Sequence, residues 1–266
     1  QERDDPSLAR ACKYQALAGF DPGSAPPTWL EAVDGLSARL GHAGTEEALA
    51  ASTRLSAGLA GIESLVSALE ASPIAVDLSR LPDFVARERD DLPWRRGARA
   101  AQALRTKLGV PRGRLTRDCL EELLGVRLPL EKSTWRGGRS LLGALRHRGH
   151  EKRTGVILTT DREPSQRFFL ARLIAAAHAS SPEENLLAVS DATTAFQKFQ
   201  RSFAQEFLCP WTDLDSFTNE SGTDDDGVLA ASEAFCVSER LVLTTLVNKG
   251  KLPRERLFGC ETPWSR

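Results

Sequence analysis

The side chains that could bind a metal ion or carry thiol chemistry are few and scattered. The chain has four histidines and five cysteines, and no two cysteines form a C-x-x-C pair. An odd number of distant cysteines argues against a disulfide framework and against a cysteine zinc site, so we expect reduced thiols. The residues concerned are His42, His147, His150 and His178, with Cys12, Cys119, Cys209, Cys236 and Cys260.

A histidine metal site would need an unusual arrangement, because zinc sites require several ligands that converge on one point. His147 and His150 fall in or near a predicted hairpin turn. His178 could join Glu183 or Glu184 only after the chain rearranges. We interpret all four histidines as ordinary surface or helix-end residues, and we expect neither a metal nor a cofactor.

Positive charge is concentrated in the middle of the chain. Residues 94–153 hold 16 Lys and Arg against 5 Asp and Glu, a net charge of +11, whereas residues 1–93 carry −7 and residues 154–266 carry −5. Such a segment could contact nucleic acid or an acidic partner. Trp94 and Trp135 are its only aromatic residues, unlike the interleaved aromatics of a single-strand binding surface. A solvated helix surface is the simpler interpretation.

Length and composition indicate a globular protein with a sizeable core. The chain has 266 residues, 41% of them hydrophobic, which allows one or two domains. It lacks a run of about eighteen apolar residues, so we expect no membrane contact. The first residues, QERDDPSLARAC, lack the basic-then-apolar pattern of a signal peptide, and we expect a cytoplasmic protein.

The elements that must position these side chains begin with a helical N-terminal third. Leu30, Val33, Leu36 and Leu40 recur at helical spacing. A second, long helix is predicted from Glu46 to Glu70 by the same periodicity. We therefore predict an N-terminal helical domain over residues 1–85.

The remainder, residues 86–266, combines helices with a small sheet. The fold class that we predict is α+β, mostly helical, with about three strands packed on the helix that carries Arg172. The segment 219–226 is polar and is predicted to be a mobile loop. Helices are expected at 94–108, 115–124, 165–178, 192–208 and, as a C-terminal pair within 227–250, at 227–235 and 238–248; strands are expected at 126–130, 140–146 and 154–160.

Several short segments between Leu92 and Leu252 resemble the bacterial ImmA/IrrE-type metallopeptidase family in residue pattern, order and spacing. The family's signature helix reads R-F-T-L-A-H-E-L-G-H, and this chain has RFFLARLIAA at 167–176. The resemblance implies a zincin-like fold for this domain. The other matching segments are AAQALRTKLGV at 100–110, VILTT at 156–160, FAQEFLCP at 203–210 and ASEAFCVSERL at 231–241.

The resemblance also implies that the chemistry has been lost. The family needs two histidines one helical turn apart to bind zinc, and a Glu as general base. Arg172, Leu173 and Ala176 occupy those three positions here, and no carboxylate stands at the third ligand position near Phe199 and Gln200. The fixed positive charge of Arg172 would also oppose a dication. We therefore expect no catalytic residues and lean away from an enzyme.

A polar group of residues is expected in place of the metal. Because a buried charge must be paired, our hypothesis is that Arg172 pairs with a carboxylate and that a polar network joins its helix to the facing one. Alternatively, Arg172, Lys198 and Arg201 line a site for a small anion or an acidic peptide; the sequence leaves both open. The residues of this degenerate site are Arg172, Leu173, Ala176, Lys198, Arg201 and Glu206.

The function that the resemblance implies is regulatory. Proteins of this type often act beside transcriptional repressors in stress, phage or mobile-element responses. We expect a non-catalytic pseudo-peptidase that binds a protein partner, such as a repressor-type regulator. An alternative is a DNA-binding transcriptional regulator that uses the basic segment 94–153. A metallopeptidase with unusual ligands ranks last.

Overall fold

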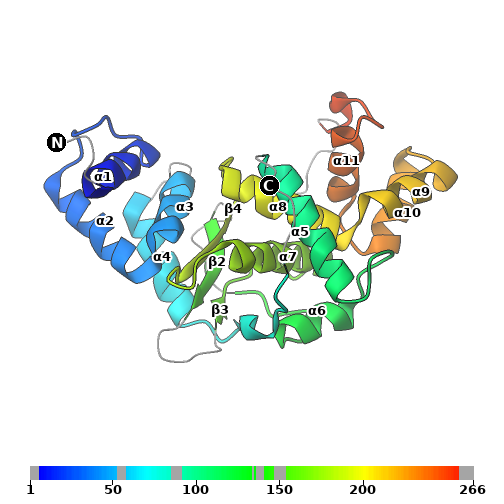
Figure 1. Cartoon of the computed structure of the whole chain (residues 1–266), viewed down its shortest axis with the longest axis horizontal. Helices are drawn as coiled ribbons and strands as arrows, with labels where there is room; N and C mark the ends of the chain where they lie inside the picture. The colour runs from blue at the N-terminus through cyan, green and yellow to red at the C-terminus, as the bar shows by residue number, and fades with distance from the viewer. Residues whose placement is uncertain are drawn as a thin grey trace.

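The computed structural model describes residues 6–52, 58–84, 92–133, 135, 141–146 and 154–257. Within these ranges the chain forms eleven α-helices and one four-stranded antiparallel sheet. Figure 1 shows the sheet near the middle, with the first four helices on one side and the last three helices at the far end. The predicted α+β class with mostly helical content is confirmed.

The sheet has the strand order β1-β3-β2-β4. The predicted hairpin partners pair as expected, with Ala144 opposite Val156, while the connecting residues 147–153 lie outside the described ranges. The sheet has four strands and not about three: two of the three predicted strands are present, and two further strands were not predicted. The strands are β1 (Ala75–Val76), β2 (Leu141–Arg146), β3 (Thr154–Val156) and β4 (Leu186–Ser190).

The predicted strand at 126–130 is wrong, because its backbone donors are satisfied elsewhere. The N–H of Val126 donates to the carbonyl of Glu121, and the N–H of Leu128 donates to the Glu121 carboxylate at 2.7 Å. Pro129 has no N–H to offer a neighbouring strand. The segment therefore follows the end of a helix and does not join the sheet.

Both faces of the sheet are buried. Successive side chains of a strand point to opposite faces, so one strand can contribute residues to two cores. Leu186 and Ala188 of β4 belong to a core shared with the N-terminal helices, whereas Leu187 and Val189 belong to the larger core on the other face. All five residues of β4 are buried, so polar and apolar residues do not alternate along this strand. Periodicity alone cannot assign such a short apolar run to a strand or to a helix.

Four N-terminal helices lie on one side of the sheet, and the last two of them contact its strands. They are α1 (Pro6–Leu17), α2 (Pro27–Leu40), α3 (His42–Ser52) and α4 (Gly58–Glu70). The single helix predicted over 46–70 is therefore wrong: two helices, α3 and α4, occupy this stretch. Gly44 lets α3 approach β4, because a Cβ there would lie 2.8 Å from the Leu186 carbonyl oxygen. The predicted domain boundary between 85 and 86 lies outside the described ranges and stays a prediction.

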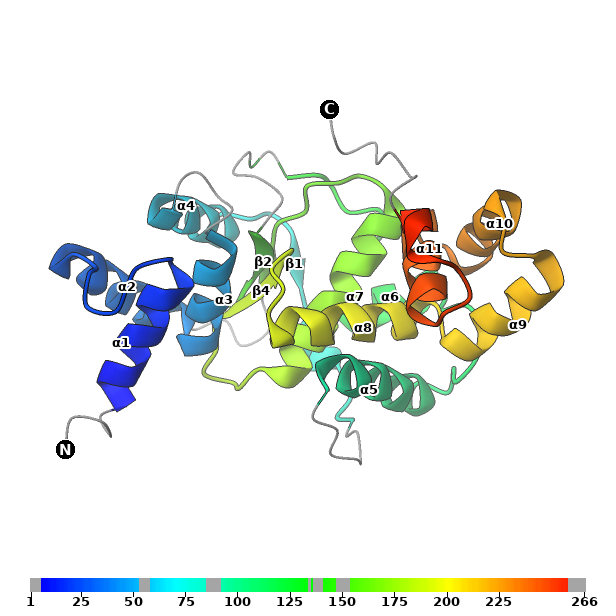
Figure 2. The same cartoon turned by 90° about the horizontal axis from the view of Figure 1, so that it is seen from above.

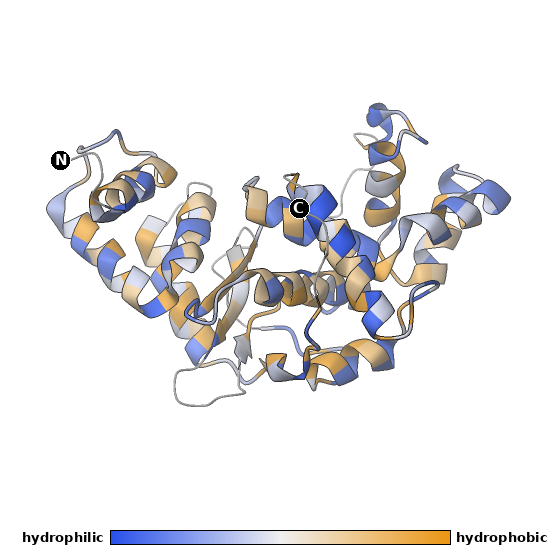
Figure 3. Ribbon diagram, viewed as in Figure 1, coloured by the Kyte–Doolittle hydropathy of each residue, from blue (hydrophilic) through white to orange (hydrophobic). Residues whose placement is uncertain are grey.

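The opposite face is covered by α7 (Glu163–Ala179), which crosses α8 (Ala195–Leu208). Figure 3 shows long hydrophobic stretches on α7 at the centre of the molecule. In Figure 2, α5 (Pro93–Lys107) runs alongside α8. Gly97 allows this close approach, because a Cβ there would collide with the Phe199 carbonyl oxygen. The predicted helices at 94–108, 165–178 and 192–208 are confirmed within a few residues.

The remaining elements are helical, and the described residues from 211 to 257 contain no strand. The helices predicted at 115–124, 227–235 and 238–248 are confirmed, but the predicted loop 219–226 is wrong, because helix residues enter it from both ends. No helix in the described ranges is long and apolar enough to cross a membrane. The elements are α6 (Arg117–Leu124), α9 (Trp211–Ser221), α10 (Asp225–Phe235) and α11 (Glu239–Asn248), with short 3-10 turns η2 (Leu78–Arg80) and η3 (Arg254–Leu257).

Candidate functional site

The three positions that the resemblance assigns to lost catalytic groups lie on α7 in different surroundings. Leu173 and Ala176 are fully buried in the larger hydrophobic core. Arg172 is 9% exposed and lies beside the end of β4 and the start of α8. Only Arg172 of the three therefore presents a polar group to its surroundings.

The guanidinium of Arg172 joins three elements. Its Nη2 donates to the carbonyl oxygen of Ser190 at the end of β4 and to the Oε1 of Gln197 on α8, both at 2.5 Å. The same Gln197 oxygen accepts the backbone N–H of Ser190 at 3.0 Å. These bonds tie α7, β4 and α8 together at one point.

The network continues into the N-terminal helices. The Nε2 of Gln197 donates to the Oε2 of Glu47 on α3 at 2.9 Å. Thr194, which caps α8, donates its hydroxyl to the same carboxylate oxygen at 2.9 Å. Burial raises the pKa of Glu47 above its ordinary value, while the bonds from Gln197 and Thr194 act in the opposite direction. Arg172 thus reaches a carboxylate through Gln197, and the direct pair that we expected is replaced by neutral acceptors.

The charge of Arg172 is held in a mostly neutral environment. Burial first, and then the nearby Arg201, lower the pKa of Arg172 to about 9, and Asp191 and Glu47 oppose this effect. The guanidinium therefore stays protonated at neutral pH. It lies 5.9 Å from the ring centroid of Phe168, and its buried Nε has no hydrogen-bond partner.

Side chains close the free edge of β4. One edge of this strand pairs with β2. On the other edge, the Ala188 carbonyl accepts from the Nε2 atoms of Gln197 and Gln200, at 3.1 and 2.9 Å. The Ser190 carbonyl accepts from Arg172 and, at 3.5 Å, from Arg201. An edge whose acceptors are already occupied does not offer a template for a further strand.

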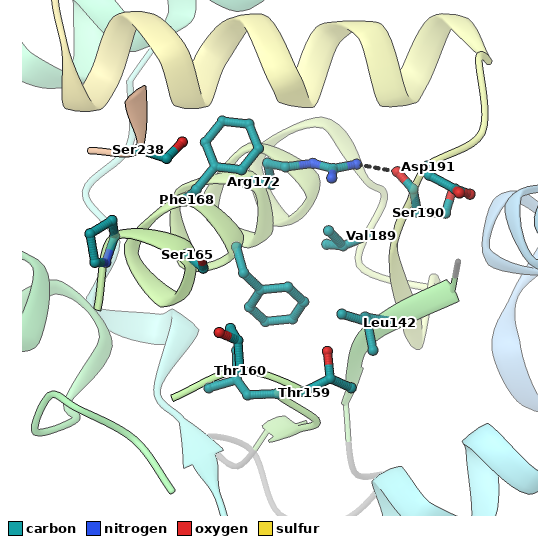
Figure 4. A pocket seen from close by; sticks show the side chains of 13 residues that line it. Leu142, Thr159, Thr160, Ser165, Phe168, Arg172, Val189, Ser190, Asp191 and Ser238 are labelled. Atoms are coloured by element: carbon teal, nitrogen blue, oxygen red, sulfur yellow. Dashed lines mark hydrogen bonds between the residues drawn. The ribbon is translucent and has the colours of Figure 1, made fainter. Parts of the chain in front are cut away.

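A cavity of about 250 Å³ opens beside Arg172. Figure 4 shows Phe168, Thr160, Val189 and Ser238 around it, with Arg172 directed towards Ser190. Its walls are mainly apolar, with hydroxyl groups among them. The cavity lies between the first turns of α7, the end of β4 and the start of α11. The lining residues are Leu142, Leu158, Thr159, Thr160, Pro164, Ser165, Phe168, Phe169, Arg172, Val189, Ser190, Asp191 and Ser238.

The other predicted site residues lie away from this cavity. Lys198 and Arg201 line a larger groove of about 800 Å³ between α5, α8 and α11. Arg201 still approaches the network, because it donates to Ala192 O at 3.0 Å and shares the Ser190 carbonyl with Arg172. Glu206 is buried at the far end of α8, where it accepts from Gln102 Nε2 at 2.8 Å. The six residues therefore do not form one site.

The histidine and glutamate candidates have separate structural contacts. The His178 ring stacks on Phe84 with centroids 3.9 Å apart, and burial lowers its pKa. The carboxylate of Glu184 accepts the N–H groups of Ala43 and Gly44 at the start of α3. His147 and His150 lie outside the described ranges. Across the residues that the structure describes, no three His, Cys, Asp or Glu side chains are grouped so as to hold a metal ion.

Several cations of the basic segment take part in contacts within the protein. Arg105 is 1% exposed and donates to the carbonyls of Phe207 and Gly113, both at 2.6 Å. Arg117 pairs with Glu121 at 3.0 Å, and Arg146 donates to two carbonyl oxygens near the start of β4. The charge excess of residues 94–153 is thus partly a structural feature.

Glu47 and Ser190 are among the network members that sequence reasoning missed. Glu47 read as an ordinary acidic residue at a helix start, and Ser190 contributes mainly its backbone. Neither carries a local signal, because their partners come from distant segments.

No protein-family model matches this chain, and neither a curated protein nor a solved structure matches it. The resemblance to the ImmA/IrrE family stays a prediction.

Proposed function

We propose that the protein is a non-catalytic ImmA/IrrE-like regulator, a zincin-like pseudo-peptidase that binds a protein partner in the cytoplasm without cutting it. The partner that we propose is a repressor-type transcriptional regulator of a bacterial stress, phage or mobile-element response. The observation that carries the proposal is the bonding of Arg172 to Ser190 and Gln197. It stands where the resemblance places the first zinc ligand.

At the position where the resemblance places a zinc ligand, the hydrogen bonds of Arg172 hold neighbouring elements together. A bound zinc would join the helices that supply its ligands, and here Arg172 and Gln197 already join α7 to α8 and β4. A guanidinium is permanently charged under physiological conditions and repels a dication. The arrangement therefore favours a preserved fold without peptidase chemistry.

The shape of the site suggests how a partner would dock. Because side chains occupy the free edge of β4, the partner does not add a strand there. The neighbouring cavity is lined by Phe168, Phe169 and Leu158, with Thr160 and Ser165 as hydroxyl donors and Arg172 as a cation. We propose that it receives one bulky apolar side chain of the partner next to an acidic group.

Zinc binding tests the non-catalytic half of the proposal. The purified chain would be exposed to zinc, gel-filtered and analysed for metal by mass spectrometry. We expect close to no zinc per chain. One tightly held zinc per chain, together with cleavage of a protein substrate, would contradict the proposal and make His147, His150 and His178 the first residues to substitute.

Peptide selection tests the binding half. A displayed library of random peptides would be panned on the protein, and the selected peptides would be measured against two variants. Thr160→Arg places a large side chain at the cavity, whereas Thr106→Arg makes the same change on the exposed side of α5. We expect selected peptides to lose binding to the first variant only. Equal binding to both variants would reject the cavity as the docking site.

A further inference from the structure

The larger groove gathers positive charge from segments that are far apart in the sequence. It has a volume of about 800 Å³, within the range of ~300–1,000 Å³ that ligand sites usually occupy. Only one of its basic residues belongs to the basic segment 94–153. The cations that line it are Arg95 at the start of α5, Lys198 and Arg201 on α8, Lys249 after α11, and Arg254 of η3.

The acidic residue that lines this groove, Glu206, is hydrogen-bonded to uncharged groups. Glu206 is buried, and its carboxylate oxygens accept from the Gln102 amide at 2.8 Å and from the N–H of Trp211 at 3.2 Å. Lys198, Lys249 and Arg254 are exposed at the groove. A concave surface with this excess of cations attracts anionic ligands, although the whole chain has a net charge of only −1.

An exposed indole lies beside the cations. Trp94 lines the groove and is 49% exposed. Its carbonyl oxygen accepts the hydroxyl of Ser202 on α8 at 2.6 Å, which fixes the start of α5 against the groove. A planar aromatic face next to cations is the combination that binds unpaired bases and phosphates together.

We propose that this groove binds single-stranded nucleic acid, with phosphates on the Lys198, Lys249 and Arg254 side chains and a base stacked on Trp94. Stacking needs an unpaired base, which a duplex does not present. The amide and hydroxyl groups of Gln205, Asn248 and Thr244 also line the groove and can bond sugars or base edges. This inference does not depend on the proposed pseudo-peptidase function.

Fluorescence anisotropy with a labelled oligothymidylate at low salt tests the site. An oligouridylate, a duplex and a glutamate-rich peptide serve as competitors. We expect the oligouridylate to compete well and the other two to compete weakly. Equal competition by the duplex, or by the acidic peptide, would overturn the proposal in favour of those ligands, and no binding at low salt would remove it.

Charge variants identify the groove as the binding surface. Each phosphate contact on a single strand contributes about −0.7 to the slope of log K against log salt. The double variant Lys198→Gln/Lys249→Gln should therefore reduce the magnitude of that slope by about 1.4. The control Lys107→Gln/Lys132→Gln removes two exposed lysines that do not line the groove. An unchanged slope for the first pair, or the same loss for the control pair, would overturn the assignment.

The Trp94 variant separates stacking from charge. Trp94→Ala should weaken oligothymidylate binding by about 5-fold or more, because stacking of a base on an aromatic ring is lost. Binding of inorganic polyphosphate, which has no base, should not change. Unchanged oligothymidylate binding, or an equal loss for polyphosphate, would overturn the stacking role; thermal unfolding of each variant shows whether it is folded.

Discussion

The side-chain amide of Gln197 donates a 2.9 Å hydrogen bond to the carboxylate of Glu47, which lies 150 positions earlier in the chain. The same amide binds Arg172 and the edge of β4. Gln197 therefore connects the N-terminal helices, the sheet and the two long helices of the candidate site, and this connection makes the network testable by stability measurements.

Arg172→Ala should lower the free energy of unfolding by about 1.5–3 kcal/mol, because hydrogen bonds of a charged donor are lost and the partner groups stay buried. Urea unfolding measures the change. Arg240→Ala, at an exposed position on α11, is the control and should change stability by less than about 0.5 kcal/mol. Equal stability of Arg172→Ala and the wild type would show that the network does not hold the helices together.

Gln197 and Glu47 should be energetically coupled. In a double-mutant cycle, Gln197→Ala and Glu47→Ala should show an interaction free energy of about 0.5–3 kcal/mol, as residues in one hydrogen-bond network do. Gln102→Ala combined with Glu47→Ala is the matched comparison, because Gln102 bonds to Glu206 elsewhere. That pair should be additive within about 0.5 kcal/mol. Additivity of both pairs would mean that the Gln197–Glu47 bond contributes nothing measurable.

Stability should depend on pH through Glu47. Burial raises the pKa of this carboxyl in the folded state, so the folded state holds its proton more tightly than the unfolded state. Its contribution is fully present below the unfolded pKa and is lost as pH rises through the higher folded pKa. Glu47→Gln should flatten this part of the pH–stability curve, whereas Glu31→Gln, at an exposed position, should leave it unchanged. A steeper fall in Glu47→Gln than in the wild type would reverse the sign of the argument.

Gly97 should tolerate no side chain. Gly97→Ala places a Cβ against the Phe199 carbonyl, and the shift of α5 from α8 should cost about 1–3 kcal/mol of unfolding free energy. Gly35→Ala on α2 meets no atom within 4 Å and should be neutral or stabilising by up to about 1 kcal/mol. Chemical denaturation of both variants compares them directly. A neutral Gly97→Ala would show that α5 and α8 pack less closely than described.

Local signals in the sequence account for most of the helices. The apolar spacing and the caps Thr194 and Ser238 place α8 and α11, because a cap bonds backbone groups only three residues away. Where the local signal was ambiguous, the prediction failed. The five buried residues of β4 lack alternation, and the alternation at 126–130 arises from a segment whose N–H groups bond to Glu121.

The sequence by itself determined the mostly helical α+β class and the charge of Arg172. In the sequence, Lys198 and Arg201 lie many residues away from the other cations of the groove, so no local pattern links them. Only the tertiary structure decided that Arg172 binds Ser190 and Gln197, and that Arg201, Lys249 and Arg254 line one groove. The physical reason is that helix periodicity and caps act over a few neighbouring residues, whereas a polar network and a groove arise from helices and strands that meet only when their apolar faces are buried together.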